Sequence, residues 1–333
     1  PYIALQLKAV SLSVETVVAH FDMGSVAGGA IPRMPDVSLL VALAMAAFAC
    51  LFGTRHIDAT EHQEGLMLAV AAESIVKLIA FSAVGIYVVW GLFGGPSDFL
   101  ARTADLPGVH AMFERDLSGG SWIVMSLLSF FAILLLPRMF HVTVVENNSV
   151  DELKTARWLF PVYLVAINVF VIPLAMAGHA LLGPNVDVDS FVLRVPLDAG
   201  STVFTILAFI AGLSAATAMV IVASVALGIM VCNELVVPVL IRHGSLGDEK
   251  EDMGLQLLIV RRIAIFCILL LAYAYYRTVA DSAALAEIGL LAFAAIAQFA
   301  PAFFGGMLWR RATARGAIAG MLAGFGIWFY TLL

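Results

Sequence analysis

Two residues of opposite charge lie four positions apart inside a long apolar stretch, at Glu73 and Lys77. In an α-helix this spacing places both side chains on one face, where they can form an ion pair. A charged side chain is costly inside a membrane and by default indicates a function there. Two interpretations stay open. The pair neutralises itself and joins helices of a bundle, or Lys77 handles a proton or binds the carboxylate of a substrate.

A pair of hydroxyl side chains, Ser214 and Thr217, lies in a second apolar stretch, AFIAGLSAATAMVIVASVALGIMVCNELVVP, at 208–238. A helix of about 20 apolar residues crosses ~30 Å of hydrocarbon, so this stretch is long enough to span a bilayer. Its small residues favour close helix packing, and a hydroxyl group in lipid must find a partner or bind something. The stretch predicts a membrane helix beside a site for a polar solute or ion.

Carboxylates and imidazoles are dense in the sequence GTRHIDATEHQEG, at 53–65, before the stretch that holds Glu73. Such side chains can hold a metal ion. Asp58 followed by Glu61 also fits a helix N-cap with an acidic residue in the first turn, which suits the helix dipole. Metal binding, capping, and a gate or ion exit are the alternatives for this segment.

A proline interrupts another apolar stretch at Pro137, in the sequence LLLPRMFH. Proline removes a backbone donor, so the helix either ends here or continues as a broken spanning helix. In secondary transporters, the freed backbone groups of broken helices coordinate a solute. If the helix is broken, we expect Ser126, Ser129, Phe130 and Phe131 to line the site.

The composition is that of an integral membrane protein. The chain is 62% hydrophobic and 13% charged, with a mean hydropathy of +1.00, whereas soluble domains are about 45–50% apolar and about 25% charged. The net charge of −6 is no argument for an acidic soluble partner, and we expect no nucleic-acid partner. The three cysteines are far apart without CxxC spacing, so neither a disulfide framework nor a zinc site is indicated.

The apolar stretches predict an all-α fold, a single polytopic bundle over residues 1–333 that is expected to be a fragment truncated at both ends. Lys8 and Lys77 are basic residues that fall inside the predicted spans, away from the ends of the spans. The predicted helices cover approximately 1–20, 37–53, 64–93, 120–137, 158–182, 200–232, 256–278, 283–308 and 316–333.

Basic residues in alternate loops orient this bundle, because cytoplasmic loops carry an excess of Lys and Arg. The richer side is expected in the cytoplasm, so the first helix runs outward. That side carries Arg55, Arg138, Lys154, Arg157, Arg242, Lys250, Arg261, Arg262, Arg310, Arg311 and Arg315, and the other carries Arg33, Arg102, Arg115, Arg194 and Arg277.

Several segments resemble the sodium/solute symporter family. The stretch QFAPAFFGGMLWRRATARGAIAGMLAG, at 298–324, is similar to the family signature, in which a proline-containing helix ends at a Trp with basic residues and a GA-x-A-G helix follows. The stretch at 208–238 resembles the eighth core helix, and PYIALQLKAVS resembles the third. The resemblance covers nearly the whole chain. It is strongest to the branch fused to sensor histidine kinases, given PYIALQLKAVS, GTRHIDATEHQEG and LPRMF followed by ENNSVDELKTARWLFPVYL.

The resemblance implies a LeuT-like core of two inverted five-helix repeats, of which this chain would supply core helices three to ten and one more. It also implies an ion site on the eighth core helix at Ala211, Ser214 and Ala215. Ser214 matches a sodium ligand of the family, whereas Ala215 replaces the second hydroxyl. The site is therefore expected to be degenerate, which opens proton-coupled or sodium-independent transport.

Candidate residues of the substrate or proton pathway are Glu61, Glu73, Lys77 and Gln298. Glu61 and Lys77 compete as proton carriers, because 16 residues of helix separate them by ~24 Å and both cannot adjoin one mid-membrane site.

The expected function is secondary active transport of a small polar organic solute, an amino acid or a short carboxylate, by alternating access. Coupling to sodium or to protons is expected, with no other cofactor and no enzymatic activity in this chain. The alternative is a solute-sensing input domain of a sensor histidine kinase, with C-terminal signalling domains in the parent protein. The expected location is the inner membrane of a bacterium, with the solute and the lipid bilayer as partners.

Overall fold

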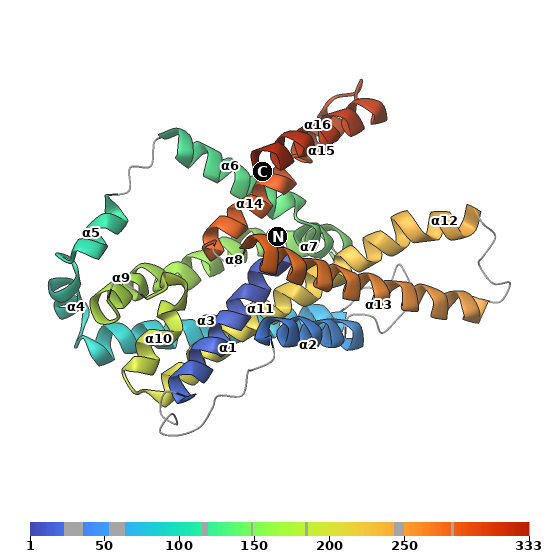
Figure 1. Ribbon diagram of the computed structural model, residues 1–333. Helices are drawn as coiled ribbons and strands as arrows, with labels where there is room; N and C mark the ends of the chain where they lie inside the picture. The colour runs from blue at the N-terminus through green and yellow to red at the C-terminus, as the bar shows by residue number, and fades with distance from the viewer. Residues whose placement is uncertain are drawn as a thin grey trace.

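The structure, a computed structural model, describes residues 1–22, 36–52, 64–114, 119–147, 149–183, 186–242, 250–280 and 283–332. Within these ranges all regular secondary structure is helical, which confirms the predicted all-α class (Figure 1). Each of the nine apolar stretches coincides with a helix or with consecutive helical segments.

The long helical segments are α1 (Tyr2–Asp22), α2 (Val37–Phe52), α3 (Glu64–Ile86) with η1 (Tyr87–Leu92), α6 (Gly119–Leu135), α8 (Val150–Asn168), α9 (Val171–Leu181), α11 (Thr202–Met230) with η4 (Val231–Val236) and α12 (Val237–Arg242), α13 (Lys250–Tyr275) with η5 (Tyr276–Ala280), α14 (Leu285–Ala297), α15 (Ala300–Leu308) and α16 (Ala314–Leu332).

One helix start differs from the prediction because polar residues extend an apolar stretch. The helix predicted from 158 begins at Val150, because Ser149 caps it by accepting a hydrogen bond from the backbone N–H of Glu152. Acidic residues Asp151 and Glu152 lie in its first turn, where the helix dipole favours them. Hydropathy does not register these local signals.

Six helical segments are long and apolar enough to cross a membrane, and a bent pair gives a seventh, within the part of the chain that the structure describes. Helix α2, with 16 residues, is shorter than a typical span. The protein is therefore a multi-pass membrane protein, as the composition predicted.

The segments predicted as loops at 94–119 and 183–199 contain four short helices. Proline begins α4 and α5, where its missing N–H costs nothing. Helix α10 is largely buried through Phe191, Leu193, Val195 and Leu197, so this connection is part of the core. The four are α4 (Pro96–Thr103), α5 (Pro107–Phe113), η3 (Val188–Ser190) and α10 (Phe191–Asp198).

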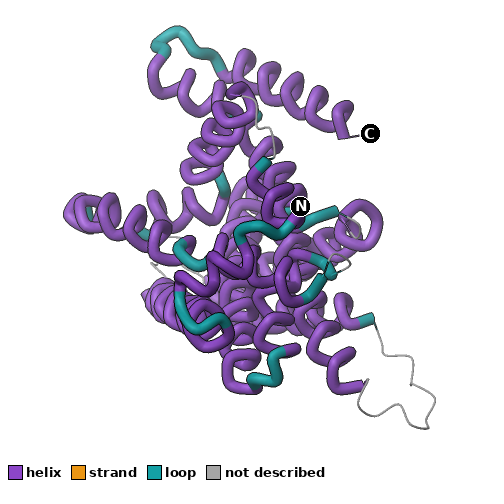
Figure 2. The backbone as a smooth tube through the Cα atoms, turned by 90° about the vertical axis from the view of Figure 1, so that its left-hand side faces the viewer, coloured by secondary structure: helices purple, strands orange, loops and turns teal. Residues whose placement is uncertain are grey.

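Helix α11 is the central element of the bundle. One apolar cluster joins it to α1, α2 and α13, and a second joins its first half to α3, η1, α9 and α10. Buried alanines along α11, such as Ala211, Ala216 and Ala223, let neighbouring helices approach closely. Helices α15 and α16 extend away from this bundle at the top of both views (Figures 1 and 2).

Two glycines of the second cluster are required by packing. A Cβ atom at Gly85 would overlap the ring of Phe170, and one at Gly178 would overlap the ring of Phe191. These close contacts fix α9 between α3 and α10, and so position the face of α3 that meets α11.

Candidate functional site

The contact between α3 and α11 brings together the two polar pairs that the sequence separates by about 140 residues. Thr217 Oγ1 donates a hydrogen bond of 3.0 Å to Glu73 Oε1, and Ser214 Oγ lies 3.5 Å from the backbone carbonyl oxygen of Glu73. All three side chains are half-buried, and Thr217 lies near the middle of α11. Inside this membrane-spanning contact, one hydroxyl group thus meets the Glu73 carboxylate and a second meets the Glu73 backbone.

The Thr217 hydroxyl has three acceptors within reach and only one proton to donate. Besides the Glu73 carboxylate, the acceptors are the carbonyl oxygens of Leu213 at 2.9 Å and Ser214 at 3.2 Å. The hydroxyl therefore keeps a hydrogen bond within its own helix when Glu73 moves away or binds a proton.

Lys77 lies one turn beyond Glu73 on α3, with its side chain half-buried. The two groups make no direct ion pair within the described part of the chain, although their charges act on each other. The Glu73 carboxylate is held by Thr217 instead. The Lys77 ammonium group thereby keeps donors that a ligand can use.

The helix interrupted by Pro137 continues after a bend. Helix α6 ends at Leu135, and α7 (Pro137–Phe140) with η2 (His141–Val145) follows at an angle of 50°. Leu136 takes an extended ψ of 128°, and Pro137 has no N–H to donate to the preceding turn. Helical structure thus continues past Pro137 after the bend, and a solute site at the break stays a prediction.

The continuation places Arg138 beside α1 and α11, not in the cytoplasmic loop to which the charge pattern assigned it. Its guanidinium lies 4.9 Å from the ring centroid of Tyr2, and the Tyr2 hydroxyl donates to Met219 Sδ on α11. The charge of Arg138 acts on Lys77. The missed signal was the apolar continuation His141–Val145 (HVTVV), which can extend a span past the proline.

The residues expected along α6 lie elsewhere. Phe130 and Phe131 pack against Phe304 of α15, with ring centroids 6.3 Å and 5.9 Å away, and Ser126 and Ser129 are exposed. The aromatic pair therefore belongs to the contact between α6 and α15.

Gln298 also lies in a helix contact of its own. It is at the end of α14, where its side-chain amide donates to the carbonyl oxygen of Ala294, and it packs against Gly324 of α16. On α11, Ala211 is buried and Ala215 is half-buried. Glu61 lies outside the described residues.

Metal-binding groups are not evident in the described ranges, where no three His, Cys, Asp or Glu side chains converge. At the positions that the resemblance assigned to sodium, Ser214 supplies one side-chain oxygen and Ala215 supplies none. The chemistry available between α3 and α11 is proton binding on Glu73 and polar contact through Ser214, Thr217 and Lys77.

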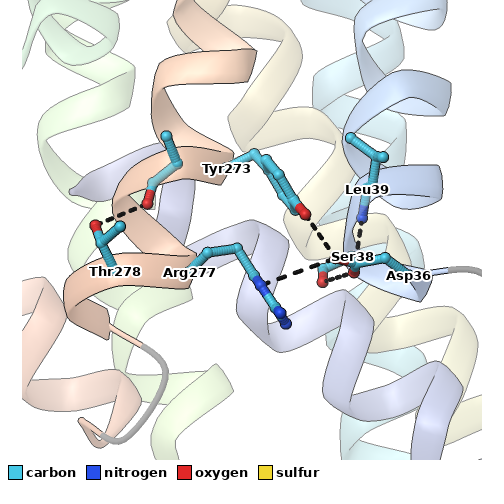
Figure 3. Close-up of polar contacts among 7 residues, drawn as sticks. Asp36, Ser38, Leu39, Tyr273, Arg277 and Thr278 are labelled. Carbon is cyan, nitrogen blue, oxygen red and sulfur yellow. Dashed lines mark hydrogen bonds and ion pairs between the residues drawn. The ribbon is translucent and has the colours of Figure 1, made fainter.

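A separate polar group joins the start of α2 to the end of α13 (Figure 3). The Asp36 carboxylate accepts hydrogen bonds from the hydroxyls of Ser38 and Tyr273 and from the backbone N–H of Leu39, and Arg277 Nε lies 3.8 Å away. These donors, led by Ser38 and then Tyr273, lower the pKa of Asp36 to about 2. Asp36 therefore stays ionised and holds the two helices together.

We expect Asp36→Asn to lower the free energy of unfolding by about 1 kcal/mol at neutral pH, a value reduced because the carboxylate is 30% exposed. Its folded pKa lies below the unfolded value of 3.8, so the stabilisation is complete above about pH 4 and is lost as the pH falls towards 2. Melting temperatures of both proteins from pH 6 to pH 2 test this. A difference that stays constant over that range would contradict it.

Comparison with protein-family models, with curated proteins and with solved structures finds no match. The resemblance to the sodium/solute symporters therefore stays a prediction.

Proposed function

We propose that this protein moves a small polar organic solute across the membrane by alternating access, with the contact between α3 and α11 as its ion-coupling site. The observation that carries the proposal is the hydrogen bond from Thr217 to the Glu73 carboxylate between two membrane-spanning helices. A carboxylate in that position is costly for a purely structural role, and such groups characterise proton and ion pathways.

Protonation of Glu73 can weaken the contact between α3 and α11 at a small cost in free energy. Protonation removes the charge of Glu73 and weakens its hold on the Thr217 hydroxyl, which retains the Leu213 carbonyl as a partner. The bend between α6 and α7 adjoins this contact, because α7 packs on α11. Discontinuous helices beside a central site are a recurring device of secondary transporters.

The charges near Glu73 favour a proton over sodium as the coupling ion. Lys77 carries a positive charge one turn from Glu73 on α3, and this charge opposes binding of a metal cation. Ala215 adds no oxygen ligand. A proton needs only the carboxylate itself. The LeuT-like arrangement and the bacterial inner membrane are parts of the proposal that rest on the resemblance.

Uptake by the complete protein in proteoliposomes tests the proposal. With a panel of radiolabelled amino acids and short carboxylates, we expect uptake driven by an inward proton gradient and changed less than about twofold by replacing sodium with potassium. Uptake that vanishes without a sodium gradient and ignores the proton gradient would contradict proton coupling. Absence of uptake under either gradient would contradict transport.

A further inference from the structure

Helix α13 carries a buried arginine whose charge has no partner in the described part of the chain. Arg261 is only 6% exposed, and its Nε atom is enclosed without a hydrogen-bond partner. The ion pairs of the described residues do not include it. A buried charged donor without a partner costs more free energy than a neutral one. This cost favours an anion that binds Arg261 from outside the chain.

The ends of α2 and α11 and the start of η4 meet α13 around this arginine. In the last turns of α11, a Cβ atom at Gly228 would lie 3.6 Å from the Arg261 carbonyl oxygen. Cys232 Sγ of η4 donates to a backbone carbonyl one turn earlier on α13, that of Leu257. Cys50 Sγ, near the end of α2, lies 3.7 Å from the carbonyl oxygen that follows Arg261.

The helices that pack on α13 provide no counter-charge at this level within the described ranges. Helices α2 and α11 contain no acidic residue, and Glu234 of η4 is exposed. In α1, Glu15 and Asp22 belong to the half of the helix that lies beside Asp198, before the start of α11. Arg261 lies at the opposite end of α11.

The depth of Arg261 in the membrane points to a lipid headgroup. Residues 263–276 carry no charge, and Arg261 and Arg277 on either side of this stretch are 16 positions apart, ~24 Å along the helix. The hydrocarbon core is ~30 Å thick, so Arg261 lies close to its edge, next to the headgroup region. The charge pattern assigns this edge to the cytoplasmic side, whose leaflet carries anionic lipids.

The surface beside Arg261 also suits the acyl part of a lipid. Arg262 is exposed, and so is Phe266, which lies four residues later on the same face of α13. Ile263 of α13 and Leu51 of α2 are exposed apolar residues as well. The two arginines thus adjoin apolar surface, which acyl chains can cover and a free phosphate ion cannot.

We infer that Arg261 and Arg262 bind the phosphate headgroup of an anionic phospholipid where α2 and η4 meet α13. The planar edge of a guanidinium group pairs with two phosphate oxygens, and basic pockets between membrane helices bind such headgroups. The charge of Arg262 disfavours a cationic choline group beside Arg261. Gly228 lies 11 positions, ~16 Å, beyond Thr217 on α11, so this site is separate from the Glu73 contact and does not rest on the proposed function.

Melting temperatures of the complete protein test the lipid site, because a bound ligand raises the apparent stability. The protein would be delipidated in dodecyl maltoside, and the probes are phosphatidylglycerol, phosphatidylcholine with the same acyl chains, and inorganic phosphate. We expect phosphatidylglycerol to raise the melting temperature saturably. Its half-maximal concentration should be at least about tenfold below that of phosphatidylcholine, as one charged hydrogen bond provides.

The variant Arg261→Gln should change stability in opposite directions in the two conditions. Without lipid it removes an uncompensated buried charge, so it should melt at or above the wild-type temperature. With phosphatidylglycerol it should need at least about tenfold more lipid for the half-maximal effect. A wild-type response to this lipid would overturn the inference. Melting below the wild type without lipid would show that Arg261 is paired inside the protein and would also overturn it.

Two further variants separate the fork of Arg261 from positive charge in general. Arg261→Lys keeps the charge and loses the planar edge, so it should weaken the lipid effect less than Arg261→Gln. Arg310→Gln removes an exposed arginine between α15 and α16, on the same expected side, and should leave the effect unchanged. Equal losses for Arg310→Gln and Arg261→Gln would show unspecific attraction and overturn the site.

The three probes distinguish the possible sources of the phosphate group. Inorganic phosphate that stabilises as strongly as phosphatidylglycerol at the same concentration would identify a soluble anion and overturn the lipid assignment. Equal effects of the two lipids would overturn the requirement for a net negative headgroup. No response to any probe would overturn the site, and proteoliposome uptake would still decide transport separately.

Discussion

Replacing Glu73 by Gln is expected to lower the apparent melting temperature by about 3–5 °C and to reduce proton-driven uptake at least about tenfold. The substitution removes the negative charge that lies one turn from Lys77 on α3, and leaving a half-buried charge uncompensated costs on the order of 1–2 kcal/mol. Loss of uptake has a different cause, because the amide cannot carry the coupling proton.

Adding Lys77→Met to Glu73→Gln separates the two effects. The double variant also removes the Lys77 charge that Glu73→Gln leaves uncompensated, so its melting temperature should return to within about 1–2 °C of the wild type while uptake stays low. Lys77→Met alone leaves the Glu73 carboxylate with its hydrogen bond from Thr217 and should cost little stability. Normal proton-driven uptake by Glu73→Gln would show that Glu73 does not carry the coupling proton.

Replacing Thr217 by Val is expected to reduce uptake about tenfold, with a smaller loss of stability. Valine keeps the shape of threonine and removes the hydroxyl that donates to Glu73 Oε1, and leaving a buried acceptor unsatisfied costs about 1–3 kcal/mol. Thr217→Ser keeps the hydroxyl and should retain most of the uptake. Initial uptake rates of the purified variants in proteoliposomes provide the measurement.

Thr278 offers a matched control for that substitution. In the described part of the chain, its exposed hydroxyl donates only to carbonyl oxygens of the preceding turn, at Ala274 and Tyr275. Thr278→Val should therefore leave uptake and melting temperature close to the wild-type values. Equal losses for Thr217→Val and Thr278→Val would show that the effect belongs to helical threonines in general.

The helices could be predicted from the sequence because a membrane span needs a long apolar stretch, and such stretches are local. The pairing of α3 with α11 could not be predicted, since nothing within either stretch identifies the other as its partner. The hydrogen bond between Ser38 and Asp36 is local, but the donor Tyr273 lies 237 residues away. Contacts of this kind depend on how the whole bundle packs.

Two residues show where local reasoning was insufficient. Thr217 lies ~200° around the helix from Ala215 and is a poor substitute for it, yet it faces Glu73 of α3. The charge pattern assigned Arg138 to a cytoplasmic loop, whereas it lies in α7, which follows α6 after a 50° bend. Both side chains contact a residue of another helix, Glu73 of α3 for Thr217 and Tyr2 of α1 for Arg138.

Cysteine accessibility at Ser214 tests most directly whether the contact between α3 and α11 opens to each side in turn. Cys50, Cys232 and Cys267, all free thiols, would first be replaced by alanine or serine, and Ser214→Cys would then be introduced into the complete protein. A membrane-impermeant maleimide would be applied from either side, with and without a proton gradient. We expect labelling from one side at a time, with the reactive side changed by the gradient. Labelling from neither side under all conditions would identify a static helix contact and contradict alternating access at this site.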